Sequence, residues 1–149
     1  IEKHDSGYRL HATVRLARPR DEVFPFFADA HNLDTLTPKT LRFRVLTPGP
    51  IEMPAGTLLD YRLKIRGVPI HWQSTAWEPN RRFVDEQRRG PYRWWRHEHL
   101  FESDGNATIA IDNVSYGVLG GSLINRLLVA PDLIDVFQFR TAKLLELFG

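Results

Sequence analysis

The chain has 149 residues, 42% of them hydrophobic and 26% charged, with a net charge of +2. This size and balance predict one globular domain over residues 1–149 with a sizeable core, and the small net charge gives no reason to expect a nucleic-acid partner. The sequence contains no cysteine, which excludes disulfides, thiol nucleophiles and thiolate metal sites. No apolar run approaches the roughly 20 residues of a membrane span, so we expect no transmembrane segment.

The first forty residues predict one strand followed by two short helices. Apolar and polar side chains alternate over Tyr8–Leu16, which is the pattern of a strand with one buried face. Asp21 and Glu22 precede an apolar cluster and suit the positive N-terminal end of a short helix. Asn32 can cap a second short helix, which Pro38 ends.

Between residues 41 and 118, strand patterns alternate with turn signals, and we predict six consecutive strands. The first strong turn signal inside this region is Gly67-Val68, because glycine is favoured at the first position of a two-residue hairpin loop. Such a loop would place Leu63 opposite Trp72, and directly paired residues share a face of the sheet.

The stretch Gly90–Phe101 places two histidines between large aromatic residues on one face of a strand. With a period of two residues, Trp95, His97, His99 and Phe101 share that face. A surface strand has little use for this combination. A strand that lines a cavity can use it for ligand contact, metal binding or proton transfer.

The turns on either side of this strand decide which acids face the histidines. An Asp-Gly dipeptide at residues 104–105 is a strong hairpin signal, and a two-residue loop there would place His97 directly opposite Asp112. A two-residue loop in the preceding Glu-Pro-Asn-Arg turn would place Asp85 on the same inner face. One extra residue in that loop would place Glu86 there instead.

The end of the chain predicts a long amphipathic helix. Apolar residues recur at spacings of three or four from Leu123 to Phe148, and Pro131 predicts a kink or a restart near Ala130. The element order is therefore strand, two helices, six strands and a helix (β-α-α-β6-α). We predict an α+β fold in which a curved, seven-stranded antiparallel sheet wraps around the C-terminal helix and leaves an internal cavity.

Residues along nearly the whole chain form a pattern typical of one superfamily. They are Glu22-Val23-Phe24, Phe27-Ala28-Asp29, Asn32-Leu33, Leu36-Thr37-Pro38, Gly56-Thr57, Phe83-Val84-Asp85, Gly90-Pro91-Tyr92, Trp95, His97, His99, Phe101, Asp112 and Tyr116. With them the chain resembles the helix-grip superfamily of START-like and birch-pollen-allergen-like proteins (SRPBCC). Within it, the chain looks most like the polyketide cyclase/dehydrase and lipid-transport-like branch.

The resemblance implies a cavity that binds lipids, sterols, hormones or polyketides. Some members are cyclases or dehydratases. Members are small cytosolic proteins or are fused to a nucleotide-sugar epimerase-like domain. The resemblance therefore implies a cytoplasmic location, and fusion or association with an epimerase-like protein. Because one fold hosts many activities, the fold does not select among them.

Ten side chains are candidates for ligand contact in the predicted cavity, because they lie on the inner sheet face or on the covering helix. They are Tyr61, Trp72, Phe83, Trp95, His97, His99, Phe101, Tyr116, Ile134 and Phe137.

The inward acids beside the histidines allow two interpretations. Asp112 or Asp85 can act with His97 in acid–base chemistry. The same acids can instead form structural salt bridges or hydrogen bonds to the two histidines or to Arg140. His97 and His99 could also bind zinc or iron with an acid as third ligand. No further ligand motif accompanies the pair, so we expect neither a metal nor another cofactor.

Three classes of function stay open. The leading interpretation is a ligand-binding or carrier protein for an apolar or aromatic small molecule, lipid-like or polyketide-like. The first alternative is a cyclase, dehydratase or isomerase that uses His97 with Asp112 or Asp85. The second alternative is a protein-interaction or regulatory module. Motifs of hydrolases, kinases and dehydrogenases do not occur in the sequence.

Overall fold

The structure, a computed structural model, describes residues 1–4, 7–28, 32–38, 44–45, 59–65, 68–78, 80–90, 92–118 and 121–149. In chain order the elements are β1 (Glu2–His4), β2 (Gly7–Leu16), α1 (Arg20–Ala28), α2 (Asn32–Thr35), β3 (Arg44–Val45), β4 (Leu59–Ile65), β5 (Val68–Glu78), β6 (Arg82–Arg89), β7 (Tyr92–Asp104), β8 (Ala107–Val118), α3 (Gly121–Ile124), a π-helical turn (Asn125–Val129) and α4 (Ala130–Phe148). The predicted turns that contain Gly67 and Pro91 lie partly outside the described residues, as does the loop with Gly56.

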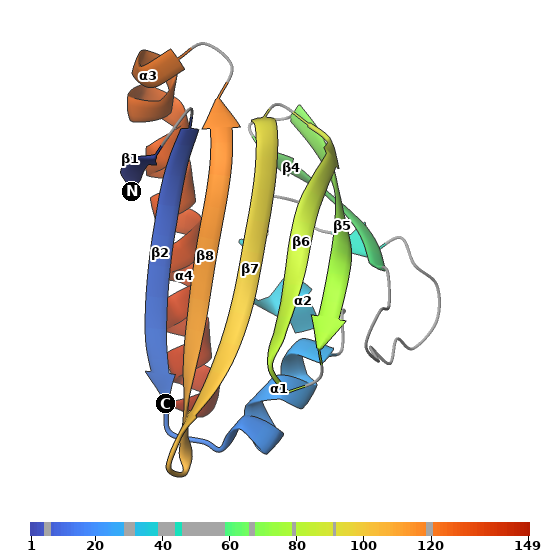
Figure 1. The fold of residues 1–149 in the computed structure, drawn as a ribbon, viewed down its shortest axis with the longest axis vertical. Helices are drawn as coiled ribbons and strands as arrows, with labels where there is room; N and C mark the ends of the chain where they lie inside the picture. The colour runs from blue at the N-terminus through green and yellow to red at the C-terminus, as the bar shows by residue number, and fades with distance from the viewer. Residues whose placement is uncertain are drawn as a thin grey trace.

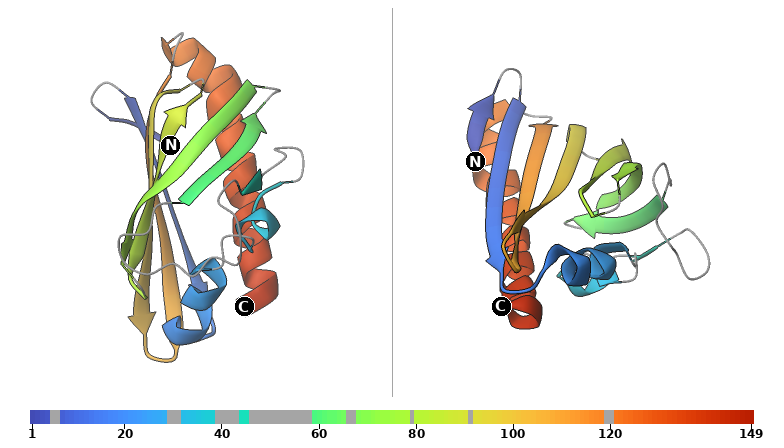
Figure 2. Two further views of the ribbon diagram at one scale, coloured as in Figure 1. Left: turned by 90° about the vertical axis from the view of Figure 1, so that its right-hand side faces the viewer. Right: turned by 60° about the horizontal axis from the view of Figure 1, so that its bottom comes forward.

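The strands form one curved antiparallel sheet in the order β1-β2-β8-β7-β6-β5-β4-β3 (Figure 1). The sheet curves between β7 and β5, and α4 lies along one side of it (Figure 2). The predicted α+β architecture with a C-terminal helix is confirmed. The predicted count of seven strands is wrong by one within the described part of the chain, because Glu2–His4 adds an edge strand against β2.

The hairpin between β7 and β8 is two residues out of the predicted register. Asp104 pairs with Ala107, so the loop is Gly105-Asn106, and Gly105 takes the positive φ of 60° that glycine accepts without strain. His99, and not His97, is therefore the residue opposite Asp112. A shift of two residues keeps every side chain on its predicted face.

The β4–β5 pair shows the same kind of error. Tyr61, and not Leu63, is the residue opposite Trp72, so this prediction is also wrong by two positions. The faces of the strand are again unchanged.

Asp85 reaches the inner face by two compensating irregularities. Glu78 pairs with Arg82, so three residues and not two connect β5 and β6. A register shift between Ser74 and Ala76 then restores the alternation, which places Asp85 opposite Ser74. The predicted loop length is wrong, whereas the predicted inward position of Asp85 is confirmed by its burial.

The inner face of the sheet packs on the helices through two apolar clusters. One cluster joins α1 and the end of α4 to the sheet and includes Phe27, Phe101 and Leu144. The other joins the middle of α4 to the sheet and includes Trp95 and Phe137. The predicted restart of the helix at Ala130 is confirmed, because the π-helical turn ends and α4 begins there.

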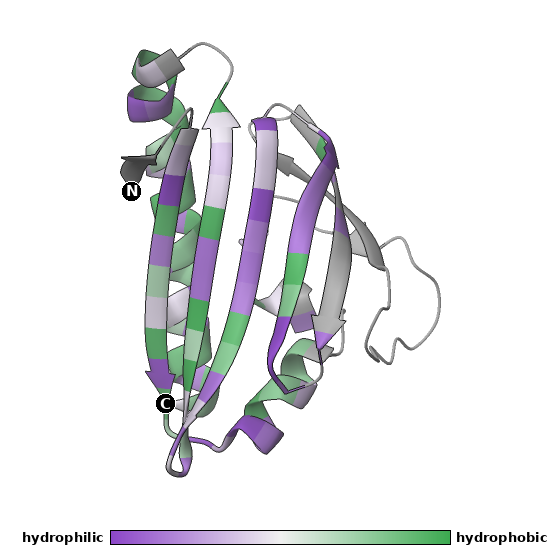
Figure 3. Cartoon of the chain, in the orientation of Figure 1, coloured by the Kyte–Doolittle hydropathy of each residue, from purple (hydrophilic) through white to green (hydrophobic). Residues whose placement is uncertain are grey.

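The strands of the sheet carry both hydrophilic and hydrophobic residues along their length (Figure 3). On the outer face of the sheet, terminal nitrogens of Arg82 lie 2.8 Å from a carboxylate oxygen of Glu78 and 2.9 Å from one of Glu98. In the described part of the chain, no helix is long and apolar enough to span a membrane.

Candidate functional site

A buried polar network lies between the two apolar clusters. It is formed by Asp85 from β6, His97 and His99 from β7, Asp112 from β8 and Arg140 from α4. The four sheet residues are between 3% and 6% exposed, and the side chain of Arg140 is 11% exposed. Charged groups are rarely this buried unless they are paired, so the contacts within the network decide its chemistry.

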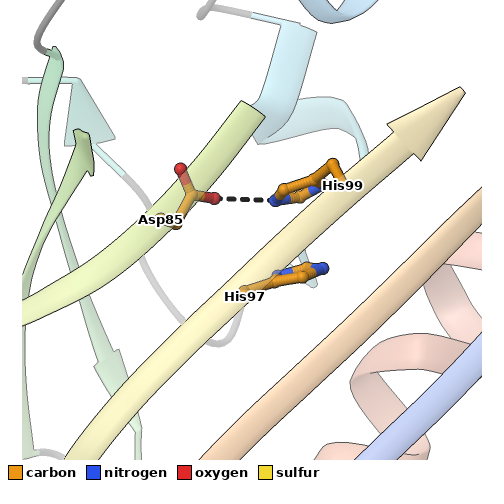
Figure 4. Close-up of side chains that lie close together, drawn as sticks. All are labelled: Asp85, His97 and His99. Atoms are coloured by element: carbon orange, nitrogen blue, oxygen red, sulfur yellow. Dashed lines mark hydrogen bonds and ion pairs between the residues drawn. The ribbon is translucent and has the colours of Figure 1, made fainter. Parts of the chain in front are cut away.

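His99 has a defined tautomer. Its Nε2 lies 2.8 Å from a carboxylate oxygen of Asp85 (Figure 4), and a terminal nitrogen of Arg140 lies 3.0 Å from its Nδ1. A guanidinium can only donate, so Nδ1 accepts and the ring proton lies on Nε2, from which it is donated to Asp85. Burial, the neighbouring His97 and the charge of Arg140 lower the pKa of His99 to about 4, against the opposing effect of Asp85.

Asp112 is held in its ionised form. Burial opposes its charge, but Arg140, the hydrogen bond from His97 and the two imidazoles together keep the pKa of Asp112 well below its usual range. Nε of Arg140 lies 3.4 Å from one carboxylate oxygen, an ion-pair distance without hydrogen-bond alignment. The carboxylate is therefore available as an acceptor for His97.

The bond to Asp112 fixes which nitrogen of His97 stays available. Nε2 of His97 lies 2.8 Å from a carboxylate oxygen of Asp112. Because the carboxylate is ionised, Nε2 donates its proton to it, and in the neutral ring Nδ1 carries the lone pair. Within the described part of the chain, Nδ1 of His97 makes no hydrogen bond. This nitrogen can accept a hydrogen bond from a ligand or take up a proton.

Aromatic rings enclose both histidines. Phe83, His99 and His97 form a stack with centroid separations of 3.8 and 3.7 Å. Trp95 approaches His97 edge-on at 6.3 Å, and Phe137 lies 5.4 Å from it. Parallel and edge-on rings at these distances attract one another, and they exclude water from the imidazoles. The site therefore combines an apolar wall with one oriented base.

Metal binding competes with the contacts already present. Asp85, His97 and His99 each offer a ligand atom, and these atoms lie within 4.8 Å of one another. A metal ion bound to His99 would have to displace either the proton that Nε2 donates to Asp85 or the guanidinium of Arg140 that contacts Nδ1. Two cations in one buried site repel each other strongly. The arrangement therefore suits proton exchange better than metal coordination.

The structure brings together the acids and histidines that the sequence singled out. The hydrogen bond between His97 and Asp112 is present, although it runs diagonally and not between directly paired residues. Asp85 is directly opposite His97 but bonds to His99. Glu86, the alternative to Asp85, has a carboxylate oxygen 4.0 Å from Nε of Arg96. The sequence suggested Arg140 only as one structural partner of the acids. Its central position could not be predicted, because Arg140 is far from the strands along the chain.

The eight residues that were predicted to contact a ligand besides the two histidines fall into three groups. Five are buried: Phe83, Trp95, Phe101, Tyr116 and Phe137. Ile134 is 43% exposed and lines a surface groove. Only the backbone pairing of Tyr61 and Trp72 is described, so their side chains lie outside the described part of the structure.

One buried polar residue was missed by the sequence interpretation. Asn125, in the π-helical turn, accepts a hydrogen bond of 2.8 Å from the hydroxyl of Tyr116. Burial and the neighbouring Tyr8 raise the pKa of Tyr116 to about 12, despite the bond to Asn125. Tyr116 therefore acts as a neutral donor. A lone asparagine among leucines gave no signal in the sequence.

Solved structures share this fold across nearly the whole chain, although no family model and no curated protein matches it. An aromatase/cyclase from a Streptomyces species is 15% identical, with a TM-score of 0.71, over 93% of this chain and 92% of that one. A START superfamily protein from Mycobacterium smegmatis is 14% identical, with a TM-score of 0.67, over 95% and 99%. A nucleoside-diphosphate sugar epimerase from Corynebacterium glutamicum is 20% identical, with a TM-score of 0.69, over 92% of this chain but 28% of that one.

These likenesses establish the fold. The chain has the helix-grip fold of START-like proteins, as its sequence pattern predicted. At these identities the comparisons carry no ligand or activity over to it.

Proposed function

We propose that this protein binds an apolar or aromatic small molecule between the inner face of its sheet and α4, with Nδ1 of His97 as the polar contact. The observation that carries the proposal is the orientation of His97. Its Nε2 is committed to Asp112, and its ring lies between Trp95 and Phe137. Apolar pockets with a few convergent polar groups are the usual form of small-molecule sites.

The geometry favours a ligand that carries a hydroxyl group on an apolar body. In the neutral ring, Nδ1 of His97 is an acceptor, so it pairs with a donor such as a phenol or an enol. A hydrogen bond from a ligand hydroxyl to this nitrogen contributes about 0.5–1.5 kcal/mol. A ligand of the same shape without the hydroxyl lacks this contribution.

Two neutral naphthalenes test this preference. Calorimetric titration with 1-naphthol and with 1-methoxynaphthalene is expected to show binding of the naphthol about tenfold tighter, because only the naphthol can donate to Nδ1. His97→Ala should remove the preference. His71→Ala is the matched control, because His71 lies on β5, two strands away from β7, and does not line the groove beside α4. Equal affinities in the wild-type protein, or a preference that survives His97→Ala, would contradict the proposal.

A second candidate function is proton-transfer catalysis of the cyclase or dehydratase type. The specific observation that favours it is the pairing of an oriented imidazole with an ionised acid, which is the arrangement of a general base and its orienting group. In such a step Nδ1 of His97 takes a proton from the carbon between two carbonyl groups, and an enolate forms. Nδ1 then exchanges that proton with solvent and delivers a solvent proton, a deuteron in D2O, to the enolate carbon.

Deuterium exchange separates this enzyme from a carrier. The measurement is proton NMR of 1-phenyl-1,3-butanedione in D2O with and without the protein. If the protein is a catalyst, the wild type accelerates exchange at the central carbon. His97→Ala should lose this acceleration, and Asp112→Asn should retain part of it. If exchange proceeds at the buffer rate and the naphthol preference is observed, the data support the binding function and not the catalytic one.

A further inference from the structure

A polar pocket of about 300 Å³ lies on the outer face of the sheet, where β2, β8 and β7 run side by side. Arg9 on β2 and Arg96 on β7 form two of its walls, and Ser115 on β8 lies between them. The register makes Ser115 the direct cross-strand partner of both arginines. Side chains of directly paired residues start about 5 Å apart, so two long cationic side chains flank a short one, and this difference in length creates the pocket.

The floor of the pocket offers hydrogen-bond donors. Oγ of Ser115 accepts a long hydrogen bond of 3.4 Å from the indole of Trp94, so the hydroxyl proton can point into the pocket. Oδ1 of Asn113 faces Nδ1 of His11 at 2.6 Å, which leaves the amide nitrogen of Asn113 as a donor. Together with the two guanidinium groups, donors therefore reach the pocket from three directions, the two walls and the floor.

The acid in the lining already has a partner. Glu98 accepts a hydrogen bond of 2.9 Å from Arg82. Arg82 also contacts Glu78 at 2.8 Å, and Arg81 contacts Glu78 at 3.1 Å. Two arginines thus balance two acids beside the pocket, so the charge of Glu98 does not cancel the charge of the pocket walls.

The contact between Arg96 and Glu86 is loose enough for a ligand to replace it. The two groups lie 4.0 Å apart, beyond hydrogen-bond range, and their side chains are 49% and 37% exposed. Exposed ion pairs of this kind contribute little. An anion between the two walls would instead receive charge-assisted hydrogen bonds, which are among the strongest that proteins make.

A tetrahedral anion with two negative charges fits this arrangement best. A carboxylate presents two oxygens in one plane and carries one charge. A phosphate monoester presents three oxygens that point in different directions, as the donors of this pocket require, and two guanidinium groups match its double charge. Its fourth bond, to the organic part of the ligand, can point from the surface of the sheet into solvent.

We propose that this pocket binds the phosphate group of a small phosphate monoester. Arg9 and Arg96 hold the phosphate from the two walls, while Ser115 and Asn113 donate to it from the floor. The volume lies at the lower end of the range of about 300–1,000 Å³ typical of small-molecule sites, which suits a small ligand. The pocket lies on the opposite face of the sheet from His97, so this site is independent of the function proposed above.

The test compares methyl phosphate with methyl sulfate at pH 8 and constant ionic strength. The two anions have the same shape, but the phosphate carries two charges, because its second pKa is about 6, and the sulfate carries one. Amide NMR titration of the wild-type protein is expected to show saturable shifts, largest around Ser115 and Arg96, with methyl sulfate binding at least fivefold more weakly. Equal affinities of the two anions, or the largest shifts elsewhere in the molecule, would overturn the proposal.

Substitution of a wall arginine tests the same site independently. Arg96→Gln should weaken methyl phosphate binding at least fivefold, because the variant loses the charge-assisted hydrogen bonds of one wall. Arg15→Gln is the matched control: Arg15 is an exposed arginine of β2 that does not line the pocket, and its substitution removes the same charge. It should change the affinity less than twofold. Equal weakening in both variants would indicate general attraction to a basic surface and would overturn the proposal.

Discussion

Arg140 donates a hydrogen bond of 3.0 Å to Nδ1 of His99, and this contact sets the tautomer of a histidine that lies 41 positions earlier in the chain. The same guanidinium stands 3.4 Å from Asp112. One side chain from α4 thereby orients both acid–histidine pairs of the sheet.

Loss of Arg140 is expected to destabilise the fold strongly. Arg140→Met leaves Asp112 as a buried carboxylate without its cation, which typically costs about 3–5 kcal/mol. Urea unfolding monitored by tryptophan fluorescence gives the change in the free energy of unfolding. Arg15→Met is the matched control, because its ion pair with Asp104 is about 60% exposed on both sides and should contribute at most about 1 kcal/mol. Similar losses in the two variants would contradict the central position of Arg140.

Stability is expected to rise with pH between 4 and 6.5 because of His99. Its pKa is about 4 in the folded protein and 6.5 in the unfolded chain, so the unfolded chain binds more protons in this window. The contribution is fully present above the unfolded value and is lost as the pH falls through the folded one. It amounts to about 3–4 kcal/mol at most, and urea unfolding at several pH values measures it.

Substitution of His99 tests this pH dependence, and His99→Gln should flatten the rise. Asp112 acts in the same direction at lower pH, because its pKa is also lowered and its contribution is lost on acidification. A rise that persists in His99→Gln would assign it to another group.

The tautomers of the two buried histidines can be measured directly. Long-range nitrogen–proton NMR at neutral pH is expected to show His99 with its proton on Nε2, because Nδ1 faces a donor. In Arg140→Met this constraint is removed, and the signals should change. A proton found on Nδ1 of His99 in the wild-type protein would contradict the assigned network.

Trp94 should make two glycine positions differ in their tolerance of alanine. The three atoms nearest to a Cβ at Gly117 all belong to the ring of Trp94, whereas those nearest to a Cβ at Gly7 include the carbonyl oxygen of Tyr116 as well as this ring. Both substitutions are expected to destabilise by about 1–3 kcal/mol. Combined with Trp94→Ala, the loss at Gly117 should largely disappear and the loss at Gly7 should remain. Equal rescue at both positions, measured by thermal unfolding, would contradict this difference.

The periodicity of the sequence determined which face each strand residue occupies. Trp95, His97, His99 and Phe101 all lie on the buried face, and Asp85 and Asp112 join them there. This information is local, because side chains on a strand alternate every residue whatever the strand pairs with. An error of two residues in a hairpin leaves it intact, as the β7–β8 pair shows.

The exact partners within that face were decided by the tertiary structure. The glycine in the β7–β8 loop moved Asp112 opposite His99, and the irregularity in β5 offset a longer loop before Asp85. Turn geometry depends on the backbone angles of one or two residues, and the same sequence is compatible with several turn geometries. Pairing at the level of single hydrogen bonds is therefore not readable from alternation.

The place of Arg140 depended on packing between elements far apart in the chain. Its helix could be predicted from spacings of three and four, but the rotation and the height of α4 against the sheet follow from how Phe137 and Leu144 fill the two apolar clusters. That packing places the guanidinium between His99 and Asp112. The acid–histidine site was thus encoded in strand alternation, whereas its charge state and tautomers exist only once the helix has docked.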